Sequence, residues 1–261
     1  MNCRVCDGNT RELFRQRVLG KYDVRYFQCS NCGMVQTEKP YWLDEAYASP
    51  IAVRDTGILW RNQQLATVAA SLFWKLFRGR GRFLDAAGGY GIFTRLMRDI
   101  GFDYYWWDPH SQNLLARGFE GSPEAGPYQA ITAFEVLEHL DDPVRFLRDI
   151  IERTGCRTLL TSTEVFRGHA PDPASWWYYT FDTGQHISFY NRSALEVIAR
   201  KLGLRLYARR NLQLWTDQPL TFLQFRIRTD FNMSRLLAMA PRRRLRSRVQ
   251  SDSEQLADFT T

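Results

Sequence analysis

A group of residues with catalytic potential follows the apolar run Tyr128–Phe134. Glu135, Glu138 and His139 stand at i, i+3 and i+4, so a helical turn opening at Glu135 would place them on one face. His186 lies in a loop expected at the same edge of the sheet. Together these carboxylates and imidazoles could bind magnesium, manganese or zinc, which would hold two neighbouring substrate hydroxyls and lower the pKa of one. Alternatively, His139 or His186 is a plain general base, which is the interpretation we favour, or the residues are structural.

A glycine-rich turn lies upstream of this group. The apolar run Phe83–Asp85 ends in an acid, the turn Ala87–Gly91 follows, and Ile92–Arg98 has helical spacing. Glycine lets the backbone pass close to a ligand, and a helix start offers free N–H groups, so the segment suits a nucleotide-type ligand. Asp108 ends a second predicted strand about 20 residues further on, where a ribose-binding carboxylate is expected.

Together these segments resemble the Rossmann-like methyltransferases that use S-adenosylmethionine (SAM), over roughly Phe83 to Arg228. The spacing of the glycines does not fit a dehydrogenase. The resemblance implies an α/β fold, with a seven-stranded sheet covered by helices on both faces. Ala87 replaces the first glycine of the family pattern, which is tolerable if its backbone keeps an ordinary dihedral. The resemblance also implies cofactor-binding roles, in which Asp85 orients the turn or the methionine part and Asp108 binds the ribose. The full implied set is Asp85, Gly88, Gly89, Gly91, Asp108 and Phe134.

Two cysteine pairs stand near the N-terminus, Cys3-x-x-Cys6 and Cys29-x-x-Cys32. Each pair can supply two ligands, from a tight turn, to one tetrahedral zinc ion. The four thiolates therefore predict a closed, structural zinc site in a ribbon. A disulfide framework is the rival interpretation, which we disfavour because disulfides are rare in cytosolic proteins. The fifth cysteine, Cys156, precedes an apolar strand and is expected to be an inert core residue.

Further resemblances indicate the class of molecule that accepts the methyl group. A zinc ribbon before a methyltransferase domain is similar to the layout of bacterial proteins from carbohydrate and polysaccharide gene clusters. The aromatic stretch Ser175–Phe181 suits the flat face of a sugar or base, or fills a core. We therefore expect methylation of a hydroxyl on a sugar, nucleotide-sugar or glycan. The Glu-x-x-Glu-His pattern also looks like that of metal-dependent small-RNA 2′-O-methyltransferases, so RNA is a second acceptor class. A non-catalytic scaffold is the third possibility.

The composition predicts a cytoplasmic globular protein with an ample core. Of the 261 residues 44% are hydrophobic, and we find neither a run of about 18 apolar residues nor a signal-peptide pattern. The formal net charge is +7, and five arginines fall within Pro241–Arg248. Such a run could contact phosphates or an anionic membrane surface, although a solvated tail is the interpretation we favour. The expected partner is a small-molecule or glycan acceptor, with nucleic acid as the less favoured alternative.

Four segments are expected along the chain. They are a zinc ribbon at 1–40, a helical cap or linker at 41–80, the methyltransferase domain at 81–232 and a basic tail at 233–261. Leu204–Ala208 and Leu220–Ile227 read as the last two strands, an antiparallel edge pair. The tail turns polar after its arginines and is expected to be mobile.

Overall fold

The computed structural model describes residues 1–48 and 55–257. The chain forms two compact units, each assembled from segments far apart in the sequence. The first contains Met1–Arg54, Phe134–Asp149 and Thr161–Trp215, and the second contains Asp55–Ala133, Ile150–Leu160 and Thr216–Thr261. These divisions do not coincide with the expected boundaries at 40, 80 and 232. Residues 49–54 of the expected linker and 258–261 of the expected tail lie outside the described residues.

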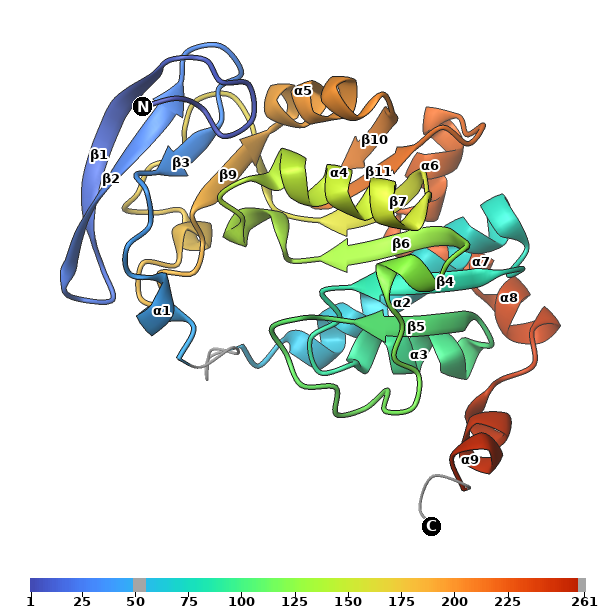
Figure 1. The fold of residues 1–261 in the computed structure, drawn as a ribbon. Coiled ribbons are helices and arrows are strands. Elements are labelled where there is room, and N and C mark those ends of the chain that lie inside the picture. Colours follow the sequence, from blue (N-terminus) through green and yellow to red (C-terminus); the bar gives the residue numbers. More distant parts are fainter. Residues whose placement is uncertain (49–54, 258–261) are drawn as a thin grey trace. The chain divides into compact units, whose positions relative to one another are not determined.

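The first unit is built on a five-stranded sheet with the order β1-β2-β3-β9-β8. Its strands are β1 (Thr10–Val18), β2 (Tyr22–Cys29), β3 (Val35–Thr37), β9 (Ser188–Asn191) and β8 (Val165–Phe166). Strand β3 pairs antiparallel with β9, with Val35 opposite Phe189. The three strands of the cysteine-containing N-terminal segment and strand β9, which follows His186, therefore belong to one sheet (Figure 1). The N-terminal ribbon is thus part of a larger unit.

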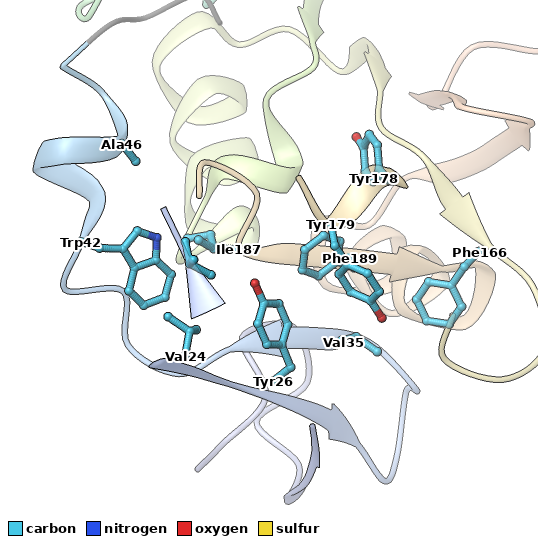
Figure 2. Packing of buried hydrophobic residues seen from close by; sticks show 11 residues of the cluster. Val24, Tyr26, Val35, Trp42, Ala46, Phe166, Tyr178, Tyr179, Ile187 and Phe189 are labelled. Carbon is cyan, nitrogen blue, oxygen red and sulfur yellow. The ribbon is translucent and has the colours of Figure 1, made fainter. Parts of the chain in front are cut away.

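A dense aromatic core stabilises this sheet. Tyr26, Tyr179 and Phe189 are buried, with the rings of Tyr179 and Phe189 only 4.8 Å apart (Figure 2). Trp42 is buried in the same cluster and donates its indole N–H to the carbonyl of Gly184 at 2.8 Å. Because each aromatic side chain buries a large apolar area, this cluster fixes the loop that leads to His186.

The first unit also contains complete elements that are not part of that sheet. They are α1 (Leu43–Ala46), the 3₁₀ turns η2 (Leu137–His139) and η3 (Trp177–Tyr179), α5 (Arg192–Leu202) and β10 (Arg205–Arg209). Helix α5 begins where the Asn191 side chain accepts the Ala194 N–H, and it ends at Gly203 in the left-handed conformation.

The second unit contains a strand–turn–helix–strand segment made of β4 (Arg82–Ala86), α3 (Ile92–Ile100) and β5 (Asp103–Trp107). Helix α2 (Ile58–Phe77) precedes this segment in the chain, and the 3₁₀ turn η1 (Pro123–Ala125) follows it. Strand β4 pairs in parallel with β5 and with β6 (Tyr128–Phe134). The ring of Phe83 is stacked between Phe73 of α2 at 5.4 Å and Tyr104 of β5 at 5.5 Å. This stack anchors β4, and with it the start of the glycine turn.

The six-stranded sheet has the order β10-β11-β7-β6-β4-β5, with β7 at Thr158–Ser162 and β11 at Leu212–Thr216. Seven strands were expected. Beyond β5, Trp106 pairs with Glu120 only as an isolated parallel bridge, so among the described residues no seventh strand forms there. Helix α4 (Pro143–Thr154) begins as expected, because Asp142 accepts the Arg145 N–H at 2.9 Å and proline occupies the first turn.

The C-terminal prediction was wrong in two respects. Leu220–Ile227 is mostly helix α6 (Phe222–Arg228), because Thr221 and Gln224 form a capping box. The expected mobile tail is also helical, as α7 (Phe231–Leu237), α8 (Met239–Arg244) and α9 (Val249–Ala257). A buried ion pair secures α9, since the Asp252 carboxylate lies 2.7 Å from the Arg98 guanidinium. Strands β10 and β11 form the sheet edge that was expected to include Leu220–Ile227.

Candidate functional site

The glycine turn between β4 and α3 contains one position that faces open space. A Cβ added to Gly88 would lie 2.6 Å from the Trp106 side chain, and one added to Gly91 would lie 2.8 Å from Asn113. Gly88 and Gly91 are therefore required by the packing of the chain itself. Gly89 has a φ of +53° and no heavy atom within 4 Å of its missing Cβ. A ligand can approach the backbone most closely there.

Ala87 does not keep an ordinary dihedral, contrary to the expectation. Its φ is +62°, in the left-handed region that disfavours a side chain. The N–H groups of Ala87 and Gly88 both bond the carbonyl of Trp107, at 2.8 and 3.2 Å. These bonds hold the strained residue in place.

Asp85 is buried behind the turn. Its carboxylate accepts the hydroxyls of Thr132 at 2.8 Å and Thr94 at 3.1 Å. Burial raises the pKa of Asp85 to about 7, and the charge of Asp108 contributes to that rise. Asp85 thus joins β4 to α3 and β6.

Asp108 lies directly beside the open glycine. One carboxylate oxygen accepts the Gly89 N–H at 2.9 Å, and the other accepts the His110 N–H at 2.8 Å. The indole N–H of Trp106 bonds the Gly89 carbonyl at 2.9 Å. Each carboxylate oxygen retains lone-pair capacity for a further donor such as a ribose hydroxyl.

Glu135 does not open a helical turn, so the expected common face with Glu138 and His139 is wrong. Its φ is +53°, and the 3₁₀ turn η2 begins only at Leu137. The Glu135 N–H bonds both the carbonyl and the hydroxyl of Ser162, at 3.2 and 3.0 Å, and the same hydroxyl donates to the Glu135 carboxylate. Glu135 is therefore held toward β7. Phe134, which precedes it, is half-buried.

Glu138, His139 and His186 converge in the first unit. One ligand atom from each lies within 4.8 Å of the others, and these atoms could hold a metal ion. The Nδ1 of His139 lies 3.0 Å from the Gln185 carbonyl, and that of His186 lies 2.7 Å from the Tyr178 carbonyl. Because a carbonyl only accepts, both Nδ1 atoms carry the proton and both Nε2 atoms have a free lone pair. Such imidazoles suit either proton acceptance or metal binding.

The carboxylate of Glu138 is buried and only partly satisfied. Tyr178 donates its hydroxyl to Oε1 at 2.6 Å, whereas Oε2 has no hydrogen-bond partner among the described residues. Glu138 therefore lies in the interior of the first unit and not on its surface. A buried carboxylate oxygen without a partner is costly, so an imidazolium or a cation beside it would be stabilised.

Tyr178 and Glu164 were missed by the sequence analysis as site residues. The Tyr178 hydroxyl accepts the Glu164 N–H at 3.1 Å while it donates to Glu138. Burial raises the pKa of Glu164, and the charges of Glu135 and Glu138 raise it further. Tyr178 is one of several aromatics in its segment, so no sequence signal separates it from its neighbours.

The surroundings of His186 disfavour the charged form of its imidazole. Burial, followed by the charge of His139, lowers the pKa of His186 to about 3. The two rings are 4.9 Å apart and nearly perpendicular. His186 therefore stays neutral at physiological pH.

The four N-terminal cysteines converge as predicted. Their sulfur atoms lie within 4.8 Å of one another, and the closest pairs are Cys6–Cys29 at 3.4 Å and Cys3–Cys32 at 3.5 Å. Backbone N–H groups point at the sulfurs of Cys3 and Cys29 at 3.3 to 3.4 Å. This cluster could hold a metal ion. Cys156 is buried elsewhere, where burial raises the pKa of its thiol to about 11, as expected of an inert residue.

The family is shown by sequence. Residues 59–209, more than half of the chain, match the family described as "Methyltransferase domain". The chain therefore belongs to this methyltransferase family. A comparison with curated proteins found no match.

Several solved structures are similar to this chain at low identity. They include mitomycin 7-O-methyltransferase MmcR, with 18% identity, a TM-score of 0.47 and coverage of 67% of this chain and 60% of that one. A protein of an O-methyltransferase family from Burkholderia thailandensis has 16% identity, a TM-score of 0.45 and coverage of 69% and 68%. Magnesium protoporphyrin IX methyltransferase from Synechocystis PCC 6803 with bound SAH has 14% identity, a TM-score of 0.43 and coverage of 67% of this chain and 93% of that one. This chain spans about 60% of the length of the first of these. The family assignment rests on the sequence match.

Proposed function

We propose that the protein transfers the methyl group of SAM to a hydroxyl of a sugar, nucleotide-sugar or glycan. The convergence of Glu138, His139 and His186 carries this proposal, because it places two imidazoles with free Nε2 atoms beside a buried carboxylate. Such a group is suited to removing a hydroxyl proton.

The glycine turn of the second unit is the proposed site for SAM. Open space at Gly89 supports close approach of the cofactor, and the adjacent carboxylate of Asp108 supports binding of the ribose hydroxyls. Asp85 acts on the turn through its bonds to Thr94 and Thr132. Phe134 would contribute an apolar contact from the end of β6.

In the proposed reaction the acceptor oxygen attacks the methyl carbon in line with the sulfonium. A new C–O bond forms while the S–C bond breaks, and the sulfur takes the electron pair. The hydroxyl proton passes to Nε2 of His139, and the resulting imidazolium is stabilised by the carboxylate of Glu138. Tyr178 holds that carboxylate in place through its hydroxyl. His186 orients the acceptor as a neutral hydrogen-bonding group.

Activation of the acceptor hydroxyl by a bound divalent cation is the second mechanism that the geometry supports. The partnerless Oε2 of Glu138 and the free Nε2 atoms of His139 and His186 fit a mixed oxygen and nitrogen donor set. When bound, such a cation would lower the pKa of the acceptor hydroxyl. Glu135 is engaged with Ser162 and falls outside this donor set.

The acceptor platform is proposed at Trp177. This side chain is 71% exposed, whereas its neighbours Tyr178 and Tyr179 belong to the core. Trp177 contacts the ring of Tyr178 at 5.2 Å, and Tyr178 contacts that of His186 at 4.4 Å. A cavity of about 330 Å³ lies along residues 173–182. An exposed indole beside such a cavity suits stacking against a sugar ring.

The cysteine cluster is proposed to hold a structural zinc ion. Four buried or half-buried cysteines, whose sulfur atoms lie within 4.8 Å of one another, suit a closed tetrahedral zinc site that leaves no position for a substrate. Metal analysis of the purified protein should give about one zinc per chain. Cys29→Ser should lose that zinc, and Cys156→Ser, a control with an equally buried thiol, should retain it.

Transfer of labelled methyl from SAM into fractionated cell extract, with and without magnesium, tests the proposed activity. Label in the carbohydrate or nucleotide-sugar fraction supports the proposal, and loss of the signal without magnesium supports the cation mechanism. Label in RNA would show that the acceptor is RNA and not a carbohydrate. Absence of both label and SAM binding would indicate a non-catalytic scaffold.

A further inference from the structure

The C-terminal helices of the second unit concentrate the positive charge of the chain. Residues 218–250 contain eight arginines and one acidic residue, Asp230, so this segment alone carries the formal net charge of +7. The remaining residues are neutral in sum. Six of these arginines are exposed and form no ion pair among the residues that the structure describes: Arg226, Arg235, Arg242, Arg243, Arg244 and Arg246.

Exposed apolar side chains gather on the same helices. More than half of the large apolar side chains exposed among the described residues lie on α6, α7, α8 or the start of α2: Leu59, Trp60, Phe222, Leu223, Ile227, Met233, Leu236 and Met239. Helices α6, α7 and α8 all contact α2 (Figure 1). Single exposed apolar residues are common on proteins, but a concentration of this kind marks an interaction surface.

A hollow joins the two kinds of side chain. Trp60 of α2, Phe231 and Arg235 of α7, and Arg242 of α8 line one cavity of about 720 Å³. The Arg235 guanidinium lies 5.5 Å from the centre of the Phe231 ring. Apolar and cationic groups therefore face the same space, which is also lined by Asp99, a carboxylate paired with Arg95. We call the surface formed by the six arginines and eight apolar residues named above the basic-apolar surface.

We infer that the basic-apolar surface docks the protein on an anionic lipid bilayer. Arginines near such a membrane are attracted by its negative surface potential, and neighbouring Trp, Phe, Leu and Met side chains can enter the boundary between headgroups and acyl chains. The exposed aliphatic side chains of Leu223, Ile227 and Leu236 favour a bilayer over nucleic acid, because they can neither stack on bases nor bond phosphates. None of the described helices is long and apolar enough to cross a membrane.

Co-sedimentation of the full chain with vesicles tests the inference. The vesicles contain phosphatidylcholine alone or mixed with phosphatidylglycerol, at about 0.1 M and about 1 M salt. Binding is expected only to the phosphatidylglycerol vesicles, and the higher salt should weaken it. Binding to neutral vesicles alone, or to neither kind, would overturn the inference. So would a short RNA that binds more tightly than the anionic vesicles.

Three variants separate the contributions. A triple variant in which Arg242, Arg243 and Arg244 are each replaced by Gln should bind the anionic vesicles about 100-fold more weakly. This loss corresponds to about 3 kcal/mol for the three arginines. Leu223→Ser combined with Leu236→Ser should weaken it about tenfold through lost apolar contact. The matched control replaces Arg11, Arg15 and Arg17, three exposed arginines of β1, with Gln and should bind normally. An equal loss in the control, or unchanged binding of the leucine variant, would refute the assigned surface.

Discussion

The guanidinium of Arg4 lies 2.7 Å from the carboxylate of Asp141, so a residue between Cys3 and Cys6 is paired with a residue just past His139. Arg4 also donates to the Ile187 carbonyl, directly after His186, and to the Glu38 carbonyl at 3.2 Å. Its side chain is only 7% exposed. The N-terminal cysteine turn is thereby attached to both histidine-bearing loops.

Arg4→Ala should lower the free energy of unfolding by about 2 to 4 kcal/mol, because it leaves several buried acceptors without a donor. It should also reduce turnover, since both histidine loops lose a shared anchor. Urea unfolding and methyl transfer would measure the two effects. Arg15→Ala is the control, because the Arg15–Glu12 pair is exposed and its loss should leave the stability nearly unchanged. Equal losses in the two variants would contradict the positioning role.

Ala87→Gly should stabilise the protein by about 1 kcal/mol, because the left-handed conformation at φ +62° is costly for alanine and not for glycine. Urea unfolding would measure the gain. Ala86→Gly, one residue earlier in β4, should instead destabilise, since that buried methyl packs in an extended strand. If both variants destabilised alike, residue 87 would not be strained.

The burial of Asp85 predicts a pH dependence of stability in the cofactor-free protein. Its folded-state pKa of about 7 lies above the ordinary value of 3.8, so the folded state binds the proton more tightly. The stability contributed by this group is fully present below about pH 4 and is lost as the pH rises to about 7. The loss is a few kcal/mol at most.

Asp85→Asn should flatten this part of the stability curve, as measured by urea unfolding between about pH 4 and 7. Asp99→Asn, which changes a partly exposed carboxylate on α3, is the control and should leave the slope unchanged. An Asp85→Asn curve with the original slope would show that another group titrates.

Asp252→Ala should destabilise the protein by about 3 to 5 kcal/mol, because the guanidinium of Arg98, 1% exposed, would lose its buried partner. Thermal unfolding would measure this change. Glu254→Ala alters an exposed carboxylate on the same helix and should cost less than about 0.5 kcal/mol. A neutral Asp252→Ala result would mean that α9 is the mobile tail that the composition suggested.

The sequence predicted best where the signal is local. The glycine turn, the start of α4 at Pro143 and the cysteine pairs each depend on residues within a few positions of one another. Helix α6 had a local signal as well, the Thr221–Gln224 capping box, but the apolar run of Leu220–Ile227 resembled a strand. The backbone of Glu135 had no such signal, because its left-handed conformation depends on Ser162, 27 positions away. The bond between Tyr178 and Glu138 joins residues 40 positions apart, and only the fold reveals it.

The central claim is that His139 and His186 act on the acceptor while the glycine turn binds SAM. Its most direct test compares methyl transfer and SAM affinity in His139→Ala, His186→Ala and the control His169→Ala, which changes an exposed histidine. We predict that the first two lose at least about 100-fold in turnover with SAM affinity unchanged, as expected when the proton acceptor His139 or the acceptor-orienting His186 is removed. The control should match the unaltered protein. Normal turnover in both His139→Ala and His186→Ala would contradict the assignment of the site.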